Sequence, residues 1–283
     1  MCILHYNHTH CGLRGKAYDA AMAPLLVQID AAGIARVALD RHERHNAFDE
    51  ALIAALTTTF NVLGIDPTVR AIVLSGEGKS FCAGADLDWM QRAAGFSEAE
   101  NRADAMRLSD MLHAIDTCAK PVIARVHGNV AGGGVGLVAC ADMVVAVDGA
   151  QFRLSEVRLG LTPATISPFV IARIGAGQAR RWFLTAEAFG AAQAHAMGLV
   201  HAVADDADAA QTIIDTWLTA LSACAPGAVA DAKALIADVA GRPIDHDLRS
   251  LTASRIAARR ASPEGREGLA AFLEKRKPHW SLR

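Results

Sequence analysis

Two segments of the chain combine small residues in a way that would expose the backbone to a ligand. Residues 80–87 are Ser-Phe-Cys-Ala-Gly-Ala-Asp-Leu, and their small side chains let a ligand approach the main chain closely. Residues 127–137 place glycines 132–134 between a predicted strand and a predicted helix, where free N–H groups favour developing negative charge. Both segments also have a structural interpretation, a tight turn in the first and close helix–sheet packing in the second.

A third segment, residues 150–163, places Glu156 among apolar residues. If the side chain is buried, the pKa of its carboxyl group rises and Glu156 becomes a usable acid or base. The alternative is an exposed side chain paired with Arg153 or Arg158. The sequence alone leaves both interpretations open.

Two nucleotide-binding patterns are incomplete. Residues 76–80 are Gly-Glu-Gly-Lys-Ser, but the full phosphate-loop pattern requires a glycine where the chain has Val73. The dinucleotide fingerprint, started at Gly132, would need its third glycine at Leu137. Both mismatches disfavour a nucleotide-binding protein.

The elements that must position these segments alternate between strands and helices. An amphipathic helix is predicted over residues 48–63, and Ser97 with Glu100 predicts a capping box at the start of another helix. Strands are predicted at residues 25–29, 34–39, 71–74, 121–126 and 143–147. This alternation predicts an α/β core over residues 23–206 with a largely parallel sheet. After about Gly190 the strand signal fades, and residues 207–283 are predicted to be a helical region.

Residues 1–22 differ from the rest because they have no apolar periodicity, and we predict a loose leader there. The spacing of Cys2, His5, His8, His10 and Cys11 matches no zinc pattern. The sequence has six cysteines and no C-x-x-C pair, which is typical of reduced thiols in a cytoplasmic protein.

Overall charge and hydropathy exclude several classes of partner. The formal net charge is -2, so no broad basic surface is expected for nucleic acid or an anionic membrane. The most apolar stretch, residues 130–147, is interrupted by Asp142 and several glycines, which makes it a poor membrane helix. No secretory signal pattern is visible at the start of the chain.

Taken together and in this order, the three segments resemble the enoyl-CoA hydratase/isomerase family, also called the crotonase superfamily. The likeness runs from about Pro24 to Trp280 and includes Arg-His-Asn-Ala-Phe at residues 44–48 and the segment 271–280. The resemblance implies a crotonase-like spiral of ββα units with a C-terminal helical trimerisation region at residues 207–283. It also implies an acyl-CoA substrate, no metal, no separate cofactor because CoA is part of the substrate, and a homotrimer or a dimer of trimers.

The resemblance also implies roles for individual residues. The backbone N–H groups of Ala85 and Gly133 would polarise the thioester carbonyl, and Glu156 would be the acid/base. Arg44, and either Lys275 or Lys277 near the carboxyl end, would contact the CoA phosphates. The remaining positions that match substrate- and CoA-binding loops are Ala47, Ala83, Asp86, Leu87, Gly132 and Gly136.

One position departs from the two-glutamate hydratases of the family, which carry a second glutamate where this chain has Gly136. A single glutamate is also found in Δ3,Δ2-enoyl-CoA isomerases of the family. A finer likeness, over residues 132–139 and 154–168, points to the 3-methylglutaconyl-CoA or γ-carboxygeranoyl-CoA hydratase branch, and so to leucine degradation or fatty acid metabolism. We expect Gly136 to open room beside C3 for such a branched, carboxylated acyl group. The alternatives are an isomerase and a non-catalytic acyl-CoA-binding protein.

Overall fold

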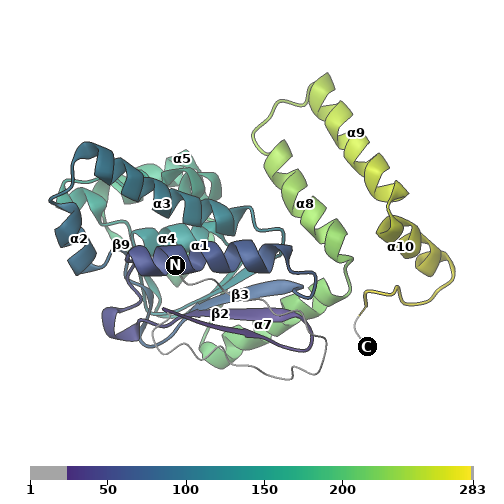
Figure 1. Cartoon of the computed structure of the whole chain (residues 1–283), viewed down its shortest axis with the longest axis horizontal. Coiled ribbons are helices and arrows are strands. Elements are labelled where there is room, and N and C mark those ends of the chain that lie inside the picture. Colours follow the sequence, from purple (N-terminus) through teal and green to yellow (C-terminus); the bar gives the residue numbers. More distant parts are fainter. Residues whose placement is uncertain (1–23, 282–283) are drawn as a thin grey trace, which may run out of the picture.

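A twisted sheet of six strands lies at the centre of the molecule and is parallel except for its first pair (Figure 1). The computed structural model describes residues 24–281, so the predicted leader and the cysteines and histidines of its first half lie outside the described residues. The order of the sheet is β1-β2-β3-β5-β7-β10, and a second sheet has the order β4-β6-β8-β9. The strands are β1 Leu25–Ile29, β2 Ile34–Leu39, β3 Ala71–Gly76, β4 Ser80–Cys82, β5 Val122–Val126, β6 Asn129–Ala131, β7 Met143–Val147, β8 Gln151–Arg153, β9 Ala188–Gly190 and β10 Ala202–Ala204.

Successive turns of the chain repeat the same unit. A strand of the large sheet is followed by a short strand of the small sheet and then by helix, as in β3-β4-α2-α3, β5-β6-α4 and β7-β8-α5. The predicted spiral of ββα units is therefore confirmed. The helices are α1 Glu50–Ile65, α2 Leu87–Ala93, α3 Glu98–Asp116, α4 Gly133–Cys140, α5 Ser167–Thr185, α6 Ala191–Ala196, α7 Ala207–Ser222, α8 Pro226–Val239, α9 His246–Ala261 and α10 Pro263–Leu273, with 3₁₀ turns η1 His42–Arg44 and η2 Glu156–Leu159.

Both faces of the large sheet are covered, because alternate side chains of its strands enter two different cores. In β3, Ile72 and Leu74 enter the main core with α1, α3 and α4, whereas Ala71 and Val73 enter a second core. Helix α7 covers that second core through Ile214. The helical layers on the two sides are visible in Figure 1.

Local sequence signals begin the helices at the expected places. Asp49 caps α1 by accepting a hydrogen bond from the N–H of Leu52 at 2.8 Å. The predicted capping box of α3 is confirmed, with the side chain of Ser97 and that of Glu100 each bonding to the other residue's backbone N–H. Helix α10 begins with Ser262 as its cap, as predicted.

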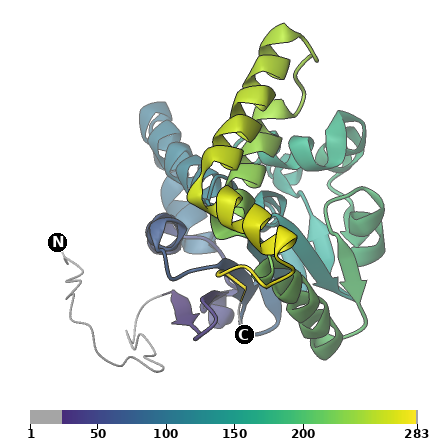
Figure 2. The ribbon, with the colours of Figure 1, turned by 90° about the vertical axis from the view of Figure 1, so that its right-hand side faces the viewer.

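The carboxyl-terminal part of the chain differs from the prediction in two ways. Strand β10 lies beyond Gly190 and extends the large sheet by pairing in parallel with β7. Helix α7 packs on the sheet, so the part of the helical region that leaves the core begins with α8 and not at residue 207. Figure 1 shows α8, α9 and α10 set apart from the sheet, and Figure 2 views the molecule from the side on which these helices lie.

The projecting helices are tied to the core by a few polar contacts. Lys233 of α8 forms an ion pair of 2.8 Å with Asp142, which also accepts a hydrogen bond from the N–H of Val122. Arg70 donates to the carbonyl oxygens of Cys224 and Trp280, both at 3.1 Å. Within residues 24–281 no single helix is both long and apolar enough to cross a membrane. Helices α7 and α8 together have the length and composition of a membrane span, but the chain bends by 108° between them.

Candidate active site

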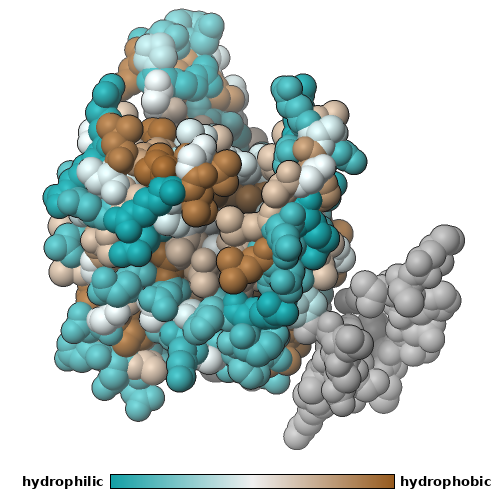
Figure 3. Space-filling view, turned by 90° about the vertical axis from the view of Figure 1, so that its left-hand side faces the viewer, coloured by the Kyte–Doolittle hydropathy of each residue, from teal (hydrophilic) through white to brown (hydrophobic). Residues whose placement is uncertain are grey.

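One cavity of about 450 Å³ collects residues from all three segments that the sequence singled out. It lies at the α2 end of the molecule, and Figure 3 views that face, where apolar side chains form a patch around a hollow. The lining consists mainly of small and apolar residues and contains two carboxylates. The lining residues are Phe48, Ala83, Gly84, Ala85, Leu87, Trp89, Met90, Ala93, Asp104, Leu108, Ala131, Gly132, Gly133, Ser155, Glu156, Leu159, Leu161, Thr162, Pro163, Ala164, Thr165 and Ile166.

The backbone N–H group of Ala85 is free to bind a ligand. Phe48 forms a parallel bridge with Ala85, in which the N–H of Phe48 donates to the carbonyl of Gly84 at 2.7 Å and its carbonyl accepts from Asp86 at 2.8 Å. This pattern uses the groups on either side of Ala85 and turns its own N–H away from Phe48. Within residues 24–281 that N–H has no acceptor.

A second free N–H group comes from the first residue of α4. Gly132 donates to the carbonyl of Arg153 at 2.9 Å, and its positive φ of 49° turns the chain into the helix. The N–H groups of a first helical turn have no partner within the helix, and that of Gly133 has no acceptor elsewhere in the part of the chain that the structure describes.

The two loops that supply these N–H groups touch through their backbones. A Cβ at Gly84 would lie 2.9 Å from the carbonyl oxygen of Ala131 and 3.8 Å from the Cα of Gly132. Such an approach is possible only without a side chain, and Gly84 has a φ of 91°, which glycine adopts without strain.

The glycines of the α4 segment serve two purposes, so both interpretations of the motif apply. Gly132 and Gly133 line the cavity. A Cβ at Gly134, by contrast, would lie 2.5 Å from the carbonyl oxygen of Cys82, so this glycine allows α4 to pack on β4. A Cβ at Gly133 would lie 2.8 Å from the ring of Phe48, which closes that side of the cavity.

Glu156 is partly buried in the cavity wall and forms no ion pair with Arg153 or Arg158 among the described residues. Its Oε2 atom is enclosed and has no hydrogen-bond partner within residues 24–281. Its Oε1 atom faces Gly132, since a Cβ built there would lie 3.2 Å away. Burial raises the pKa of the Glu156 carboxyl group, and a backbone hydrogen bond opposes this only in part. The structure thus favours the acid/base interpretation of this residue over the exposed pair.

The expectation of open room beside Gly136 is wrong. A Cβ at this position would lie 2.7 Å from Cγ2 of Ile166 and 3.4 Å from Cδ2 of Leu112. Gly136 is buried on the far side of Ile166 and does not line the cavity. The space that a glutamate would occupy is therefore filled by Ile166.

Asp86 also lies behind the cavity wall, where it holds the first loop in place. It caps α2, accepting hydrogen bonds from the N–H groups of Asp88 and Trp89. Burial by itself would raise the pKa of Asp86, but these N–H donors and the guanidinium of Arg41 outweigh it and lower the pKa. Arg41 also pairs with Asp49 at 2.9 Å, which ties the start of α1 to the same loop.

The predicted site residues are thus separated into three groups. Ala83, Ala85, Leu87, Gly132, Gly133 and Glu156 line the cavity. Ala47, Asp86 and Gly136 are buried outside it. Arg44 is exposed and pairs with Asp88 at 3.1 Å. Lys277 is exposed and follows α10, which lies at the opposite end of the molecule from α2 (Figure 1).

Sequence reasoning missed two residues of the site. Arg41 precedes the Arg-His-Asn-Ala-Phe segment, and its role depends on a partner distant in the sequence, Asp86. Asp104 is a buried carboxylate in the cavity wall, one helical turn before Leu108. Extending the apolar face of α3 by that one turn would have found it.

The comparisons with known proteins extend over most of the chain. Residues 30–283 match the family model described as Enoyl-CoA hydratase/isomerase. An enoyl-CoA hydratase of Alternaria alternata is 36% identical over 273 residues, which cover 96% of this chain and 86% of that protein. A crotonyl-CoA hydratase of Syntrophomonas wolfei is 30% identical over 245 residues, covering 86% and 92%. The crystal structure of an enoyl-CoA hydratase from Shewanella pealeana is similar with a TM-score of 0.88 and 37% identity, covering 92% of this chain and 97% of that one.

The raised pKa of Glu156 predicts a pH-dependent effect of its removal on stability. Folding raises this pKa above 4.5, so the group favours the folded state most below that value, and this contribution is lost as the pH rises through the folded value. We therefore expect Glu156→Gln to gain stability relative to the wild type as the pH rises from about 4 to about 7. Urea unfolding at both pH values measures the difference, with the exposed Glu43→Gln as control. A pH-independent difference would contradict the assignment.

The packing of Ile166 against Gly136 predicts strong coupling between the two positions. Gly136→Ala is expected to lower the free energy of unfolding by about 1–3 kcal/mol through overpacking. Ile166→Ala is expected to lower it by about 2–5 kcal/mol because it leaves a cavity. The loss in the double variant should be smaller than the sum of the two single losses by at least about 0.5 kcal/mol, since the new methyl group enters the vacated space.

Urea unfolding of the four proteins measures this coupling. Gly177→Ala is the matched control, because Gly177 also lies in a helix but has open space where its Cβ would be. It should be neutral or slightly stabilising. Simple additivity at positions 136 and 166 would show that the contact has no energetic weight.

Proposed function

Because the chain belongs to the enoyl-CoA hydratase/isomerase family, we propose that it adds water reversibly across the 2,3-double bond of an acyl-CoA thioester. One observation carries the proposal: two free backbone N–H groups, from Ala85 and Gly133, line the same cavity as Glu156, whose Oε2 atom is enclosed and without a partner in residues 24–281. An enolate chemistry needs these components, donors for a developing oxyanion and one group that moves a proton.

The N–H groups of Ala85 and Gly133 would hold the thioester oxygen. When water adds to C3, electrons move toward this oxygen and an enolate develops, which the two donors stabilise more strongly than the neutral carbonyl. Removal of one such donor typically costs about 10²–10³ in rate. Both donors belong to the main chain, so their direction depends on the loop contacts through Gly84 and Gly132.

Glu156 would carry the single proton of the reaction in both directions. As the water oxygen bonds to C3, one O–H bond of the water breaks and its proton passes to the Glu156 carboxylate. The enolate then collapses, and C2 takes that proton from Glu156, which restores the carboxylate and completes the addition of one water. A carboxyl group whose pKa is raised by burial suits this exchange, because it binds the proton more readily than an exposed one.

The CoA part of the substrate would lie along the first loop. Ala83 and Leu87 line the open end of the cavity, and the side chain of Leu87 is 76% exposed, as expected of a residue that a ligand covers. Arg44 lies next to this loop through its ion pair with Asp88 and carries a half-exposed guanidinium that could bind a phosphate.

The cavity best fits an acyl group with an uncharged chain. A branched, carboxylated group such as that of 3-methylglutaconyl-CoA is the finer possibility that the family likeness suggests. Such a group needs a cation for its distal carboxylate, and among residues 24–281 no Lys, Arg or His lines the cavity. Ile166 also fills the space beside Gly136 that a branch at C3 would have used.

The proposal predicts that Glu156→Gln lowers kcat for hydration of crotonyl-CoA by about 10²–10⁴ without weakening binding of the CoA ester. Loss of the conjugated thioester absorbance measures the rate, and mass spectrometry of the product must show the gain of one water. The matched control is Glu43→Gln, an exposed glutamate outside the cavity. Near-wild-type turnover by Glu156→Gln would contradict the mechanism.

The same assay distinguishes the alternatives. With a 3-enoyl-CoA, an isomerase forms the conjugated thioester with no change in mass. A non-catalytic binding protein would bind crotonyl-CoA, 3-methylglutaconyl-CoA and the 3-enoyl-CoA and convert none of them. Hydration of only the 3-methylglutaconyl ester would show that the carboxylated substrate is the right one.

The C-terminal helices would join three copies of the chain, or six as two trimers. Several of their apolar side chains are exposed, among them Ile236 at 71%, Phe272 at 79% and Leu273 at 78%. Exposed apolar side chains gathered on one region are typical of contact surfaces. The projecting helices α8, α9 and α10 carry such side chains, and a neighbouring copy would cover them.

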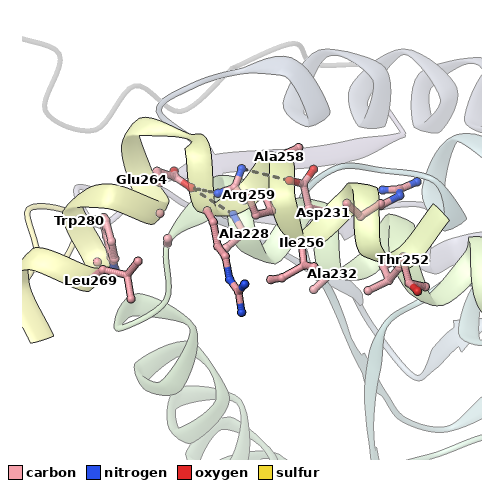
Figure 4. A pocket seen from close by; sticks show the side chains of 16 residues that line it. Ala228, Asp231, Ala232, Thr252, Ile256, Ala258, Arg259, Glu264, Leu269 and Trp280 are labelled. Atoms are coloured by element: carbon pink, nitrogen blue, oxygen red, sulfur yellow. Dashed lines mark hydrogen bonds and ion pairs between the residues drawn. The ribbon is translucent and has the colours of Figure 1, made fainter. Parts of the chain in front are cut away.

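A second cavity, of about 730 Å³, lies between α8, α9 and α10 and would belong to the contact surface between copies (Figure 4). Its walls include Ile256 and Leu269, and Arg259 holds its helices together by pairing with Asp231 at 3.1 Å and with Glu264 at 2.5 Å. Lys277 would contact a CoA phosphate from a neighbouring copy, because it follows α10, which lies far from α2 in its own chain (Figure 1).

The assembly proposal predicts a mass of three or six chains in size-exclusion chromatography with light scattering. The double variant Phe272→Asp/Leu273→Asp should shift the protein to the monomer, because charges at the contact oppose its burial. Ile65→Asp is the matched control, as Ile65 is 84% exposed at the end of α1. A monomeric wild type, or an unchanged mass in the double variant, would contradict this role.

A further inference from the structure

Asp104 lies on a face of α3 that is otherwise apolar. Leu108, Met111, Leu112 and Ile115 lie on the core-facing side of the helix, and Asp104 continues the same face one turn earlier. Its residue exposure is only 6%, and the core is otherwise almost entirely apolar. A carboxylate at such a position lowers stability relative to a leucine unless something compensates.

The ion pair with Arg107 compensates only one of its two oxygens. Oδ1 of Asp104 accepts a hydrogen bond from Nη2 of Arg107 at 2.5 Å. The side chain of Arg107 is 53% exposed and does not line the cavity. Oδ2 has no hydrogen-bond partner within residues 24–281, yet it is not among the enclosed unpaired atoms, so it keeps some exposed surface. Asp104 is one of the residues that line the acyl-CoA cavity, which makes that cavity a space from which Oδ2 can be reached.

Asp104 belongs to a different wall of this cavity from the reacting groups. Gly132, Gly133 and Glu156 come from the start of α4 and from η2, whereas Met90, Ala93 and the neighbourhood of Asp104 come from α2 and α3. A substrate whose C2 and C3 lie beside Glu156 and the N–H groups of Ala85 and Gly133 would therefore present its acyl chain, and not C2 or C3, to the wall that contains Asp104.

We propose that Asp104 determines acyl specificity: the cavity accepts acyl groups that carry a neutral hydrogen-bond donor, such as a hydroxyl, and rejects acyl groups that carry a carboxylate. This inference rests on the proposed acyl-CoA site. A carboxylate oxygen in a wall with little water is stabilised by a hydrogen-bond donor, because without one it remains an unpaired acceptor. A second carboxylate brought beside it is repelled, since Glu156 and Asp104 are the only charged residues in the lining within residues 24–281.

The test compares saturated acyl-CoAs that bind without reacting. Butyryl-CoA, 4-hydroxybutyryl-CoA and succinyl-CoA have the same carbon chain and differ only at C4, which is a methyl, a hydroxymethyl or a carboxylate group. The set is repeated with chains one and two carbons longer so that the terminal group samples the depth of the cavity. By isothermal titration, the hydroxyl ester should bind about 10-fold more tightly than the methyl ester at the best chain length, and the carboxylate ester at least about 10-fold more weakly.

Asp104→Asn separates charge from shape. It should improve binding of the carboxylate ester by at least about 10-fold, while binding of the methyl ester stays within about 2-fold. Asp110→Asn is the matched control, an exposed acid on the same helix. With the corresponding unsaturated esters, the change should appear in KM and not in kcat, because Asp104 contacts the acyl chain and not the reacting carbons.

Three results would overturn the proposal. The first is equal affinity of the three esters at every chain length. The second is preference for the carboxylate ester that is lost in Arg107→Gln, which would make Arg107 the binding group. The third is an unchanged order of affinities in Asp104→Asn together with a loss of stability like that of Arg107→Gln, which would mean that Asp104 only holds Arg107. Because these esters need no turnover, failure of hydration with the predicted binding order would contradict the hydratase proposal and not this one.

Discussion

The close approach of two backbone loops is the constraint on which the site depends. Residues 83–85 follow β4 and residues 132–133 follow β6, and these neighbouring strands of the small sheet deliver both loops to the same edge. The free N–H groups of Ala85 and Gly133 can face one cavity only because Gly84 and Gly132 add no Cβ between the chains. Two successive turns of the ββα spiral thus supply one donor each, and the bridge from Phe48 to Ala85 orients the first.

The cavity lining within residues 24–281 contains one glutamate, and packing behind the cavity wall explains why α4 has no second one. A second glutamate on α4 would have to enter the space that Ile166 fills, so its absence involves two positions and not one substitution. Glu156 remains, with one oxygen against Gly132 and the other enclosed. Burial that raises the pKa of this group opposes folding at neutral pH, and such a cost is expected where a side chain is kept for its chemistry.

The sequence predicted those features that local patterns determine. The capping box at Ser97 and the five longer strands, β1, β2, β3, β5 and β7, follow from capping chemistry and periodicity, and the structure confirms them. The short strands β4, β6, β8, β9 and β10 were missed because three residues carry too little periodic signal. The packing of Ile166 on Gly136 and the clamp of Arg41 on Asp86 could not be predicted, because each depends on which distant segments meet, which no local pattern contains.

The distribution of charge around the cavity separates the two ends of an acyl-CoA. The exposed guanidinium of Arg44 lies outside, beside the loop that would carry the phosphates, whereas the lining within residues 24–281 contains carboxylates and no cation. In the proposed complex the anionic head would lie where water screens its charge, and the neutral acyl chain would lie against a wall that disfavours anions. The same charge distribution would act on the proposed reaction, because negative charge that develops on the thioester oxygen would depend on the backbone N–H groups of Ala85 and Gly133 and on their alignment.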